Sequence, residues 1–135
     1  LASPDLAERT REAALALAQA VREHGVDADG SVLYEGEPTG ITVPEQHWWP
    51  QAAGVVGWLT AFQLGGRDAD LDAALAAWDF LDEHVVDHDR GEWWAQLDRD
   101  GRPMVEAEGS CRIGPWKCPY HNARSCLEVM RRVRA

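Results

Sequence analysis

The stretch AALALAQAVREHGVDAD at residues 13–29 returns, without a gap, as AALAAWDFLDEHVVDHD at residues 73–89. Nine of the 17 positions are identical. Each copy begins as an Ala- and Leu-rich helix and ends in an Asp-rich turn, and each is followed by an aromatic stretch, a loop and a more apolar helix. A unit of this kind cannot cover its own apolar face, so the repeat predicts helical hairpins that pack against their neighbours.

The wider hydrophobic pattern predicts an all-α chain with four helices. The second is apolar on more than one face, so we expect it to be buried nearly all round. The capping-box spacing Thr42-x-x-Glu45 predicts where it starts, and Asp70 is predicted to cap the third helix. The first is expected to end at Gly25. The predicted helices cover residues 5–24, about 50–64, about 70–86 and about 120–134.

Short strands are expected only in the loops between these helices. A strand-like run at residues 31–34 lies among turn residues. Residues 92–97 and 103–105, joined by Asp-Arg-Asp-Gly at 98–101, are predicted to pair as a hairpin. No linker or low-complexity segment divides residues 1–135, so we expect a single domain.

Charge and cysteine content exclude several classes of function. The chain has 135 residues with 13 basic and 23 acidic side chains, a net charge of −10. This acidity argues against nucleic acid and against an anionic membrane surface as partners. No apolar run approaches the roughly 20 residues of a membrane span. Three cysteines and no visible signal peptide predict a cytoplasmic protein rather than a disulfide scaffold.

Tryptophan is the unusual component, with seven Trp against two Tyr and two Phe. A surplus of Trp either fills a core or forms flat apolar faces that stack on sugar rings. Trp58 and Trp78 fit the core. Two segments instead bring Trp to the entrance of an apolar helix, where proline suits the first turn. These segments are His47-Trp48-Trp49-Pro50-Gln51 and Gly114-Pro115-Trp116-Lys117-Cys118-Pro119-Tyr120-His121-Asn122.

Each of these helix entrances could bind a ligand or simply pack. The first combines an apolar platform with the amide of Gln51. The second carries His121 and Asn122 in its first turn, where the partial positive charge of the helix favours a neutral imidazole that can accept a proton. Taken singly, packing aromatics and a hydrogen-bonded histidine explain each segment equally well. Their recurrence at equivalent places of a repeat favours a functional site.

Four stretches resemble the C-terminal part of the N-acylglucosamine 2-epimerase and cellobiose 2-epimerase family, over nearly the whole chain. That family has an (α/α)6 barrel fold. The resemblance therefore implies a partial (α/α)6 toroid of helical hairpins with short β-hairpins in the loops. The stretches are Tyr34-Glu35-Gly36-Glu37, Trp48-Trp49-Pro50-Gln51-Ala52, Gly91-Glu92-Trp93-Trp94 and the segment from Gly114 to Asn122.

The resemblance implies proton transfer on an open-chain mono- or disaccharide. His121 matches one of two imidazoles that work on opposite faces of the sugar. Trp49 and Trp116 match residues that stack on sugar rings, and Trp48 and Gln51 are further substrate-binding candidates. One base removes the proton α to the carbonyl and leaves a cis-enediolate. A second group returns a proton to the other face, or to the neighbouring carbon in an aldose–ketose isomerase. Such groups each contribute about 10²–10⁴-fold, and no metal or redox cofactor is required.

Two departures from the family pattern bear on activity. The family's second catalytic His lies in a helix that precedes the region corresponding to Leu1, as do its sugar-binding Arg and Asn. Ala53 stands where the family usually has Glu. We therefore expect the isolated chain to be incomplete and inactive. We also expect its apolar inner helices to self-associate or to be covered by a missing N-terminal half.

Other assignments remain open. The chain could be a non-catalytic remnant, or an oligomerising or sugar-binding module of the same fold. A glycosidase-like (α/α) fragment would need two well-placed carboxylates, which no helix entrance offers. Cys118-x-x-His121 with Cys111 and Cys126 matches no common zinc spacing, so we predict no metal site and small buried thiols.

Overall fold

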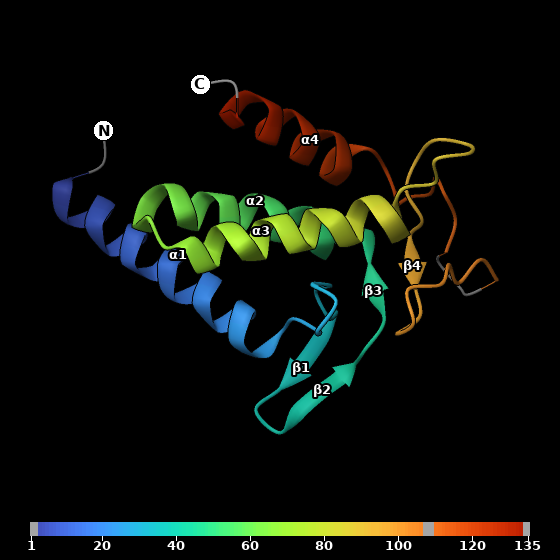
Figure 1. Cartoon of the computed structure of the whole chain (residues 1–135), viewed down its shortest axis with the longest axis horizontal. Coiled ribbons are helices and arrows are strands. Elements are labelled where there is room, and N and C mark those ends of the chain that lie inside the picture. The colour runs from blue at the N-terminus through green and yellow to red at the C-terminus, as the bar shows by residue number, and fades with distance from the viewer. Residues whose placement is uncertain (1–2, 107–109, 134–135) are drawn as a thin grey trace.

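The chain folds as a pair of central helices with one further helix on each side (Figure 1). The computed structural model describes residues 3–106 and 110–133. The prediction of a mostly helical chain is confirmed. The elements are α1 (Pro4–His24), β1 (Glu35–Glu37), β2 (Gly40–Val43), β3 (Gln46–His47), α2 (Trp48–Gly65), α3 (Asp68–Phe80) with its π-helical continuation η1 (Leu81–Val85), β4 (Gln96–Leu97) and α4 (Tyr120–Val133).

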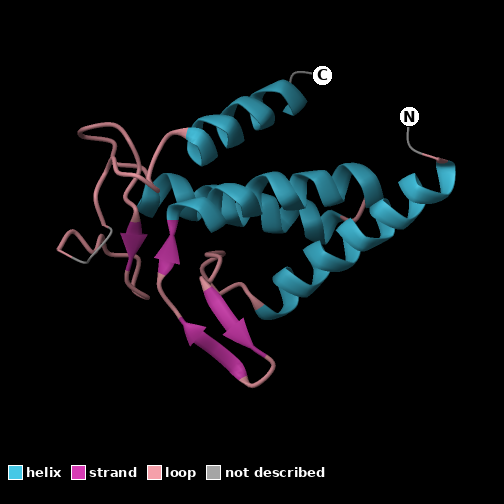
Figure 2. Ribbon diagram, turned by 180° about the vertical axis from the view of Figure 1, so that it is seen from behind, coloured by secondary structure: helices cyan, strands magenta, loops and turns pink. Residues whose placement is uncertain are grey.

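The central pair, α2 and α3, is a helical hairpin. The two helices lie side by side in Figures 1 and 2, and the chain reverses between them at Gly66, whose φ is 67°. Glycine adopts this left-handed conformation readily because it has no Cβ atom. α1 lies along one side of the pair and α4 along the other. None of the helices in the described part of the chain combines the length and apolar character needed to cross a membrane.

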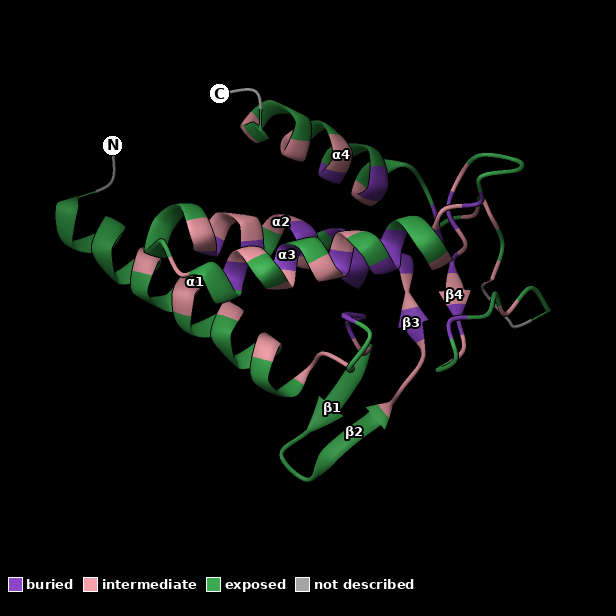
Figure 3. Cartoon of the chain, viewed as in Figure 1, coloured by how far each residue is buried: buried purple, intermediate pink, exposed green. Residues whose placement is uncertain are grey.

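The core lies where α2 packs on α3 and η1 (Figure 3). Trp58 is only 2% exposed, as predicted for a core residue, and its indole N–H donates to the carbonyl of Ala18 in α1 at 3.1 Å. Trp78 packs partly buried at the edge of the same cluster. The expectation that α2 is buried nearly all round is wrong, since seven of its 18 residues are buried and Ala53, Gly57 and Leu64 are among those exposed.

Two predicted helix caps are wrong, although both helices begin within two residues of the predicted starts. Thr42 lies in β2 and not at a helix cap, since Gly40–Val43 and Gln46–His47 form strands before α2 begins at Trp48. Asp70 lies in the first turn of α3, after the cap position Arg67. Its side chain is completely buried and pairs with Arg67 at 2.9 Å and with Arg22 of α1 at 3.5 Å. Asp70 therefore joins two helices instead of capping one.

The strands also differ in part from the prediction. In the run at 31–34, Val32 forms one isolated bridge with Val26, and the nearby hairpin is β1 with β2. The predicted pairing of 92–97 with 103–105 is reduced to a bridge between Leu97 and Pro103, closed by the turn at 98–101. β4 pairs instead with β3, antiparallel. This pairing brings the start of α2 against a segment some 50 residues later in the sequence.

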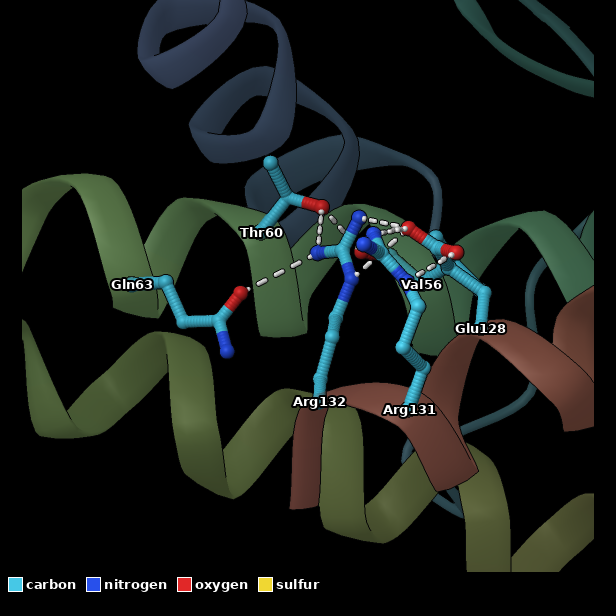
Figure 4. Close-up of polar contacts among 6 residues, drawn as sticks. All are labelled: Val56, Thr60, Gln63, Glu128, Arg131 and Arg132. Atoms are coloured by element: carbon cyan, nitrogen blue, oxygen red, sulfur yellow. Dashed lines mark hydrogen bonds and ion pairs between the residues drawn. The ribbon is translucent and has the colours of Figure 1, made fainter. Parts of the chain in front are cut away.

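α4 is attached to α2 through polar side chains, while its Cys126 and Val129 pack partly buried against the core. The hydroxyl of Ser125 donates to the carbonyl of Ala52 at 3.0 Å. Arg132 donates to the hydroxyl of Thr60 at 2.6 Å and to Gln63 at 3.2 Å (Figure 4). Hydrogen bonds from Arg131 and Arg132 lower the pKa of Glu128 to about 2, so this carboxylate stays ionised and holds both arginines. α4 is thus fixed along its length against one neighbour.

Candidate functional site

An aromatic cluster lies where α2 and α4 begin. Tyr34 stacks on His47 with ring centroids 3.9 Å apart, and it meets Trp49 edge-on at 6.1 Å. Trp49 in turn lies 6.0 Å from His121. The cluster therefore joins the loop before β1, the end of β3 and the first turns of two helices. Its members are Tyr34, His47, Trp48, Trp49, Tyr120 and His121.

His121 lies at the centre of three aromatic rings. Besides Trp49, the edge of its ring faces Trp48 at 6.4 Å and Tyr120 at 5.0 Å. The imidazole is partly exposed, so a small molecule can reach it. Its place in the first turn of α4 confirms the expected position on the helix.

His47 was not among the predicted ligand-binding residues, although it belongs to the same cluster. Burial lowers the pKa of His47 below its ordinary value of 6.5, and the negative charge of Glu45 opposes that shift without cancelling it. The neutral imidazole stacked on Tyr34 is thereby favoured near neutral pH.

The three tryptophans predicted to bind substrate differ in their exposure and in their neighbours. Trp49 is 37% exposed and lines an apolar groove of about 530 Å³ between α1 and α2. Trp116 is 88% exposed on the loop before α4, outside the aromatic cluster. Trp48 is only 8% exposed and presents its ring to His121 from within the core. Trp49 is therefore the predicted Trp that combines exposure with a contact to His121.

Gln51 has a different place from the one predicted. It is completely buried, its Oε1 accepts from the N–H of Val32 at 2.8 Å, and its Nε2 donates to the carbonyl of Val32 at 2.6 Å. Both ends of the amide are thus engaged by the backbone. The structure gives Gln51 a structural role instead of the predicted contact with a ligand.

A hollow of about 220 Å³ opens beside His121, between α2 and α4. Ala53 and Gly57 of α2 line it, and both also line the apolar groove on the α1 side. Opposite them, Glu128 and Arg124 of α4 contribute the charged part of the lining. The small side chain of Ala53 therefore leaves space next to the imidazole.

Glu92 is a carboxylate near the start of α4 that sequence reasoning did not single out. Oε1 of Glu92 accepts from Nζ of Lys117 at 2.7 Å, from Nδ2 of Asn122 at 2.6 Å and from the backbone N–H of Trp93 at 2.9 Å. Burial raises the pKa of Glu92, but these donors outweigh it and the net pKa lies below the ordinary 4.5. The only sequence signal was its occurrence in the Gly91-Glu92-Trp93-Trp94 motif.

The three cysteines differ in their exposure. Cys111 and Cys118 are exposed and Cys126 is partly buried, so the prediction of small buried thiols is wrong for the first two. Within residues 3–106 and 110–133, no group of three or more His, Cys, Asp or Glu side chains is arranged to hold a metal ion.

Comparison with known proteins identifies the family. The family model described as N-acylglucosamine 2-epimerase (GlcNAc 2-epimerase) matches residues 4–121. The chain belongs to this family. Cellobiose 2-epimerase of Ruminococcus albus is 33% identical over 133 residues, 98% of this chain and 33% of that protein. Cellobiose 2-epimerase of Dictyoglomus turgidum is 37% identical over 129 residues, 95% of this chain and 32% of that protein.

Solved structures agree with the fold. The crystal structure of a sugar epimerase from a ruminal bacterium matches with a TM-score of 0.85 at 32% identity, over 95% of this chain and 32% of that chain. A D-mannose isomerase matches with a TM-score of 0.71 at 22% identity, which supports the fold alone. The predicted partial (α/α)6 toroid is confirmed. The chain spans about a third of the length of these relatives.

Proposed function

We propose that this chain supplies one acid–base group and one aromatic wall of a carbohydrate 2-epimerase site. The observation that carries the proposal is His121, a partly exposed imidazole at a helix start with Trp48, Trp49 and Tyr120 around it. Apolar ring faces and a titratable nitrogen in one place suit a sugar, whose C–H face stacks on an indole while its carbonyl end meets the base.

The proposed chemistry is proton transfer at the carbon next to the carbonyl of an open-chain sugar. A ring nitrogen of His121 takes the proton from C2, and the electron pair of the broken C–H bond moves into a cis-enediolate. Return of a proton to the opposite face of C2 inverts that carbon, and return to C1 gives the ketose. The second acid–base group comes, by the resemblance, from the two thirds of the relatives that this chain does not cover.

Substrate size follows from the surroundings of Trp49. Its indole belongs to the aromatic cluster and also lines the apolar groove of about 530 Å³. A cavity of this size has room for more than one sugar ring. A disaccharide with its reducing end at His121 and its second ring toward the groove is the substrate class that we propose.

Exchange with solvent deuterium tests the role of His121. The chain is incubated in D2O with cellobiose or mannose, and deuterium at C2 is followed by NMR. We expect incorporation at C2 without epimerisation, because a single base can remove the proton and return a deuteron to the same face, and we expect this exchange to be lost in His121→Asn. His88→Asn is the matched control, since His88 is exposed and contacts Asp82 away from the cluster. Exchange that persists in His121→Asn would overturn the assignment.

A sugar-binding module without turnover is the second candidate. The observation that favours it is Ala53, which leaves a hollow where the family usually has a carboxylate. In this case cellobiose would shift the ring signals of Trp49 and His121 while no deuterium entered C2. Binding with exchange excludes the module, and binding without exchange excludes catalysis by the chain alone.

A further inference from the structure

The two copies of the repeat end in loops that are held in the same way. In the first copy, Val26 bridges to Val32, the N–H of Asp27 donates to the carbonyl of Ser31 at 2.9 Å, and the N–H of Gly30 donates to the carbonyl of Asp27 at 3.0 Å. In the second copy, Val86 bridges to Trp93, with Asp87 donating to Glu92 at 3.0 Å and Gly91 donating to Asp87 at 2.8 Å. Ser31 and Glu92 therefore occupy equivalent positions, because the carbonyl of each accepts from the N–H of the aspartate that begins its loop.

Two side chains five residues apart hold the first loop from the mouth of α2. Gln51 bonds both backbone groups of Val32, and Nε2 of Gln46 donates to the hydroxyl of Ser31 at 3.4 Å. Both glutamines are at most 1% exposed. We call this pair of buried, uncharged side chains the neutral clamp.

Two side chains five residues apart also hold the second loop, from the mouth of α4. Lys117 and Asn122 are 2% and 7% exposed, and both donate to Oε1 of Glu92. We call these three residues the charged clamp. It differs from the neutral clamp in using a buried ammonium and a carboxylate where the first copy uses only amides and a hydroxyl.

The backbone of Glu92 is the second difference between the copies. Its φ is 65°, a left-handed conformation that no other non-glycine residue adopts in the described part of the chain. Its equivalent Ser31 has no such φ. A side chain with a Cβ atom is disfavoured there, and conformations of this kind persist where the surrounding structure requires them, often at functional sites.

We propose that Glu92 is a positioning residue for His121. Asn122, which Glu92 holds directly, is the next residue after His121 in the first turn of α4. Lys117, the other partner, places its Nζ 5.4 Å from the ring of Trp48, which faces His121. Glu92 thus acts on His121 through the helix start and through a neighbouring ring. This role rests on the proposed function of His121.

Comparison of the two clamps indicates that holding the loop does not by itself require charged side chains. The first copy holds the same kind of loop with amides and without a non-glycine residue in the left-handed conformation. There Pro50 precedes the clamp residue Gln51, whereas in the second copy His121 precedes the clamp residue Asn122. A charge-assisted hydrogen bond is about twice as strong as a neutral one. Such bonds are of use where a neighbouring group must be held in one orientation, because small displacements of a catalytic group cost rate.

Three variants test the proposal by NMR of the His121 ring, whose signals are assigned by their absence in His121→Asn. Glu92→Gly removes the carboxylate while suiting the left-handed backbone. Glu92→Gln with Lys117→Gln converts the charged clamp into an uncharged one. Gln51→Ala is the matched control, since it breaks two hydrogen bonds of the neutral clamp. All are measured well below their own unfolding temperatures, with NOEs between His121 and Trp48 as the geometric readout.

We expect Glu92→Gly to move or split the His121 signals and to weaken its NOEs to Trp48, with partial recovery in the double variant. Gln51→Ala is expected to lower stability and to leave the His121 ring unchanged. If Glu92→Gly does not fold, Glu92→Gln alone replaces it, because it keeps an acceptor for Trp93 and Asn122. Unchanged His121 signals in the folded Glu92 variant, or the same change in Gln51→Ala, would overturn the positioning role.

The readouts separate this proposal from the proposed function. In the native chain, absence of deuterium exchange at C2 would exclude catalysis by the chain alone without affecting the NMR result. If exchange is present, Glu92→Gly is expected to slow it by about tenfold or more, with the larger effect on kcat than on KM. Normal exchange with displaced His121 signals would contradict the positioning role while leaving the proposed function in place.

Discussion

Gln51 holds both backbone groups of Val32, through an N–H···Oε1 bond of 2.8 Å and an Nε2–H···O bond of 2.6 Å. The two residues are 19 positions apart. This side chain of α2 supplies the donor and the acceptor that a neighbouring β-strand would otherwise offer to the loop backbone. The amide is completely buried, and neither of its polar ends is left for a ligand.

Gln51→Ala is expected to destabilise the fold by about 2–3 kcal/mol, because it leaves a buried N–H and a buried C=O of Val32 without partners. The measurement is urea unfolding followed by circular dichroism. Gln19→Ala on exposed α1 is the control, with an expected loss below about 0.5 kcal/mol. Equal losses in the two variants would contradict the structural role of Gln51.

Asp70→Asn is expected to lower the free energy of unfolding by about 3 kcal/mol, since it leaves Arg22 and Arg67 without their buried carboxylate. Asp68→Asn is the matched control, two residues earlier and exposed in the same first turn. Thermal unfolding of both variants at neutral pH measures the difference. A loss in Asp70→Asn no larger than in Asp68→Asn would show that the inter-helix pair contributes little.

The stability of the chain should fall as the pH drops below 6.5, partly through His47. Because burial lowers the folded-state pKa of His47 below 6.5, the unfolded chain binds its proton first, and acidification favours unfolding. The contribution of the neutral ring is complete above 6.5 and is lost as the pH falls through the folded-state pKa. His47→Phe keeps a ring against Tyr34 and should flatten the dependence of Tm on pH between about 7.5 and 5.5. The exposed His88→Phe should keep the native slope, and an equal slope in all three chains would refute the prediction.

Ala53→Glu is expected to strengthen sugar binding, because its carboxylate would enter the hollow beside His121 and accept hydrogen bonds from sugar hydroxyls. We expect the Kd for cellobiose, measured by titration calorimetry, to fall by about tenfold, as for one charge-assisted hydrogen bond. Ala53→Gln, of the same size without the charge, is the control and should gain less. Weaker binding in both variants would show that the hollow receives part of the ligand itself.

The helix order and the helical hairpins could be predicted because they depend on local periodicity. Apolar residues at helical spacing define α1, α2, α3 and α4 within a few residues, and the repeat of residues 13–29 at 73–89 predicts their stacking. The capping residues of α2 and α3 were misassigned for a common reason. Thr42 belongs to β2, which pairs with β1, and Asp70 pairs with Arg22 of α1; local capping patterns include neither of these distant neighbours.

The sequence by itself determined the family, the helical class and His121 as the candidate base, because motif spacing and periodicity are properties of the chain alone. Only the tertiary structure decided which polar residue at each helix mouth is available to a ligand. Gln51 and His121 stand in similar motifs, yet one is enclosed by the loop at Val32 and the other stays partly open among Trp48, Trp49 and Tyr120. The physical reason is that a buried polar group must find its hydrogen-bond partners wherever the fold brings them, and those partners lie far away in sequence.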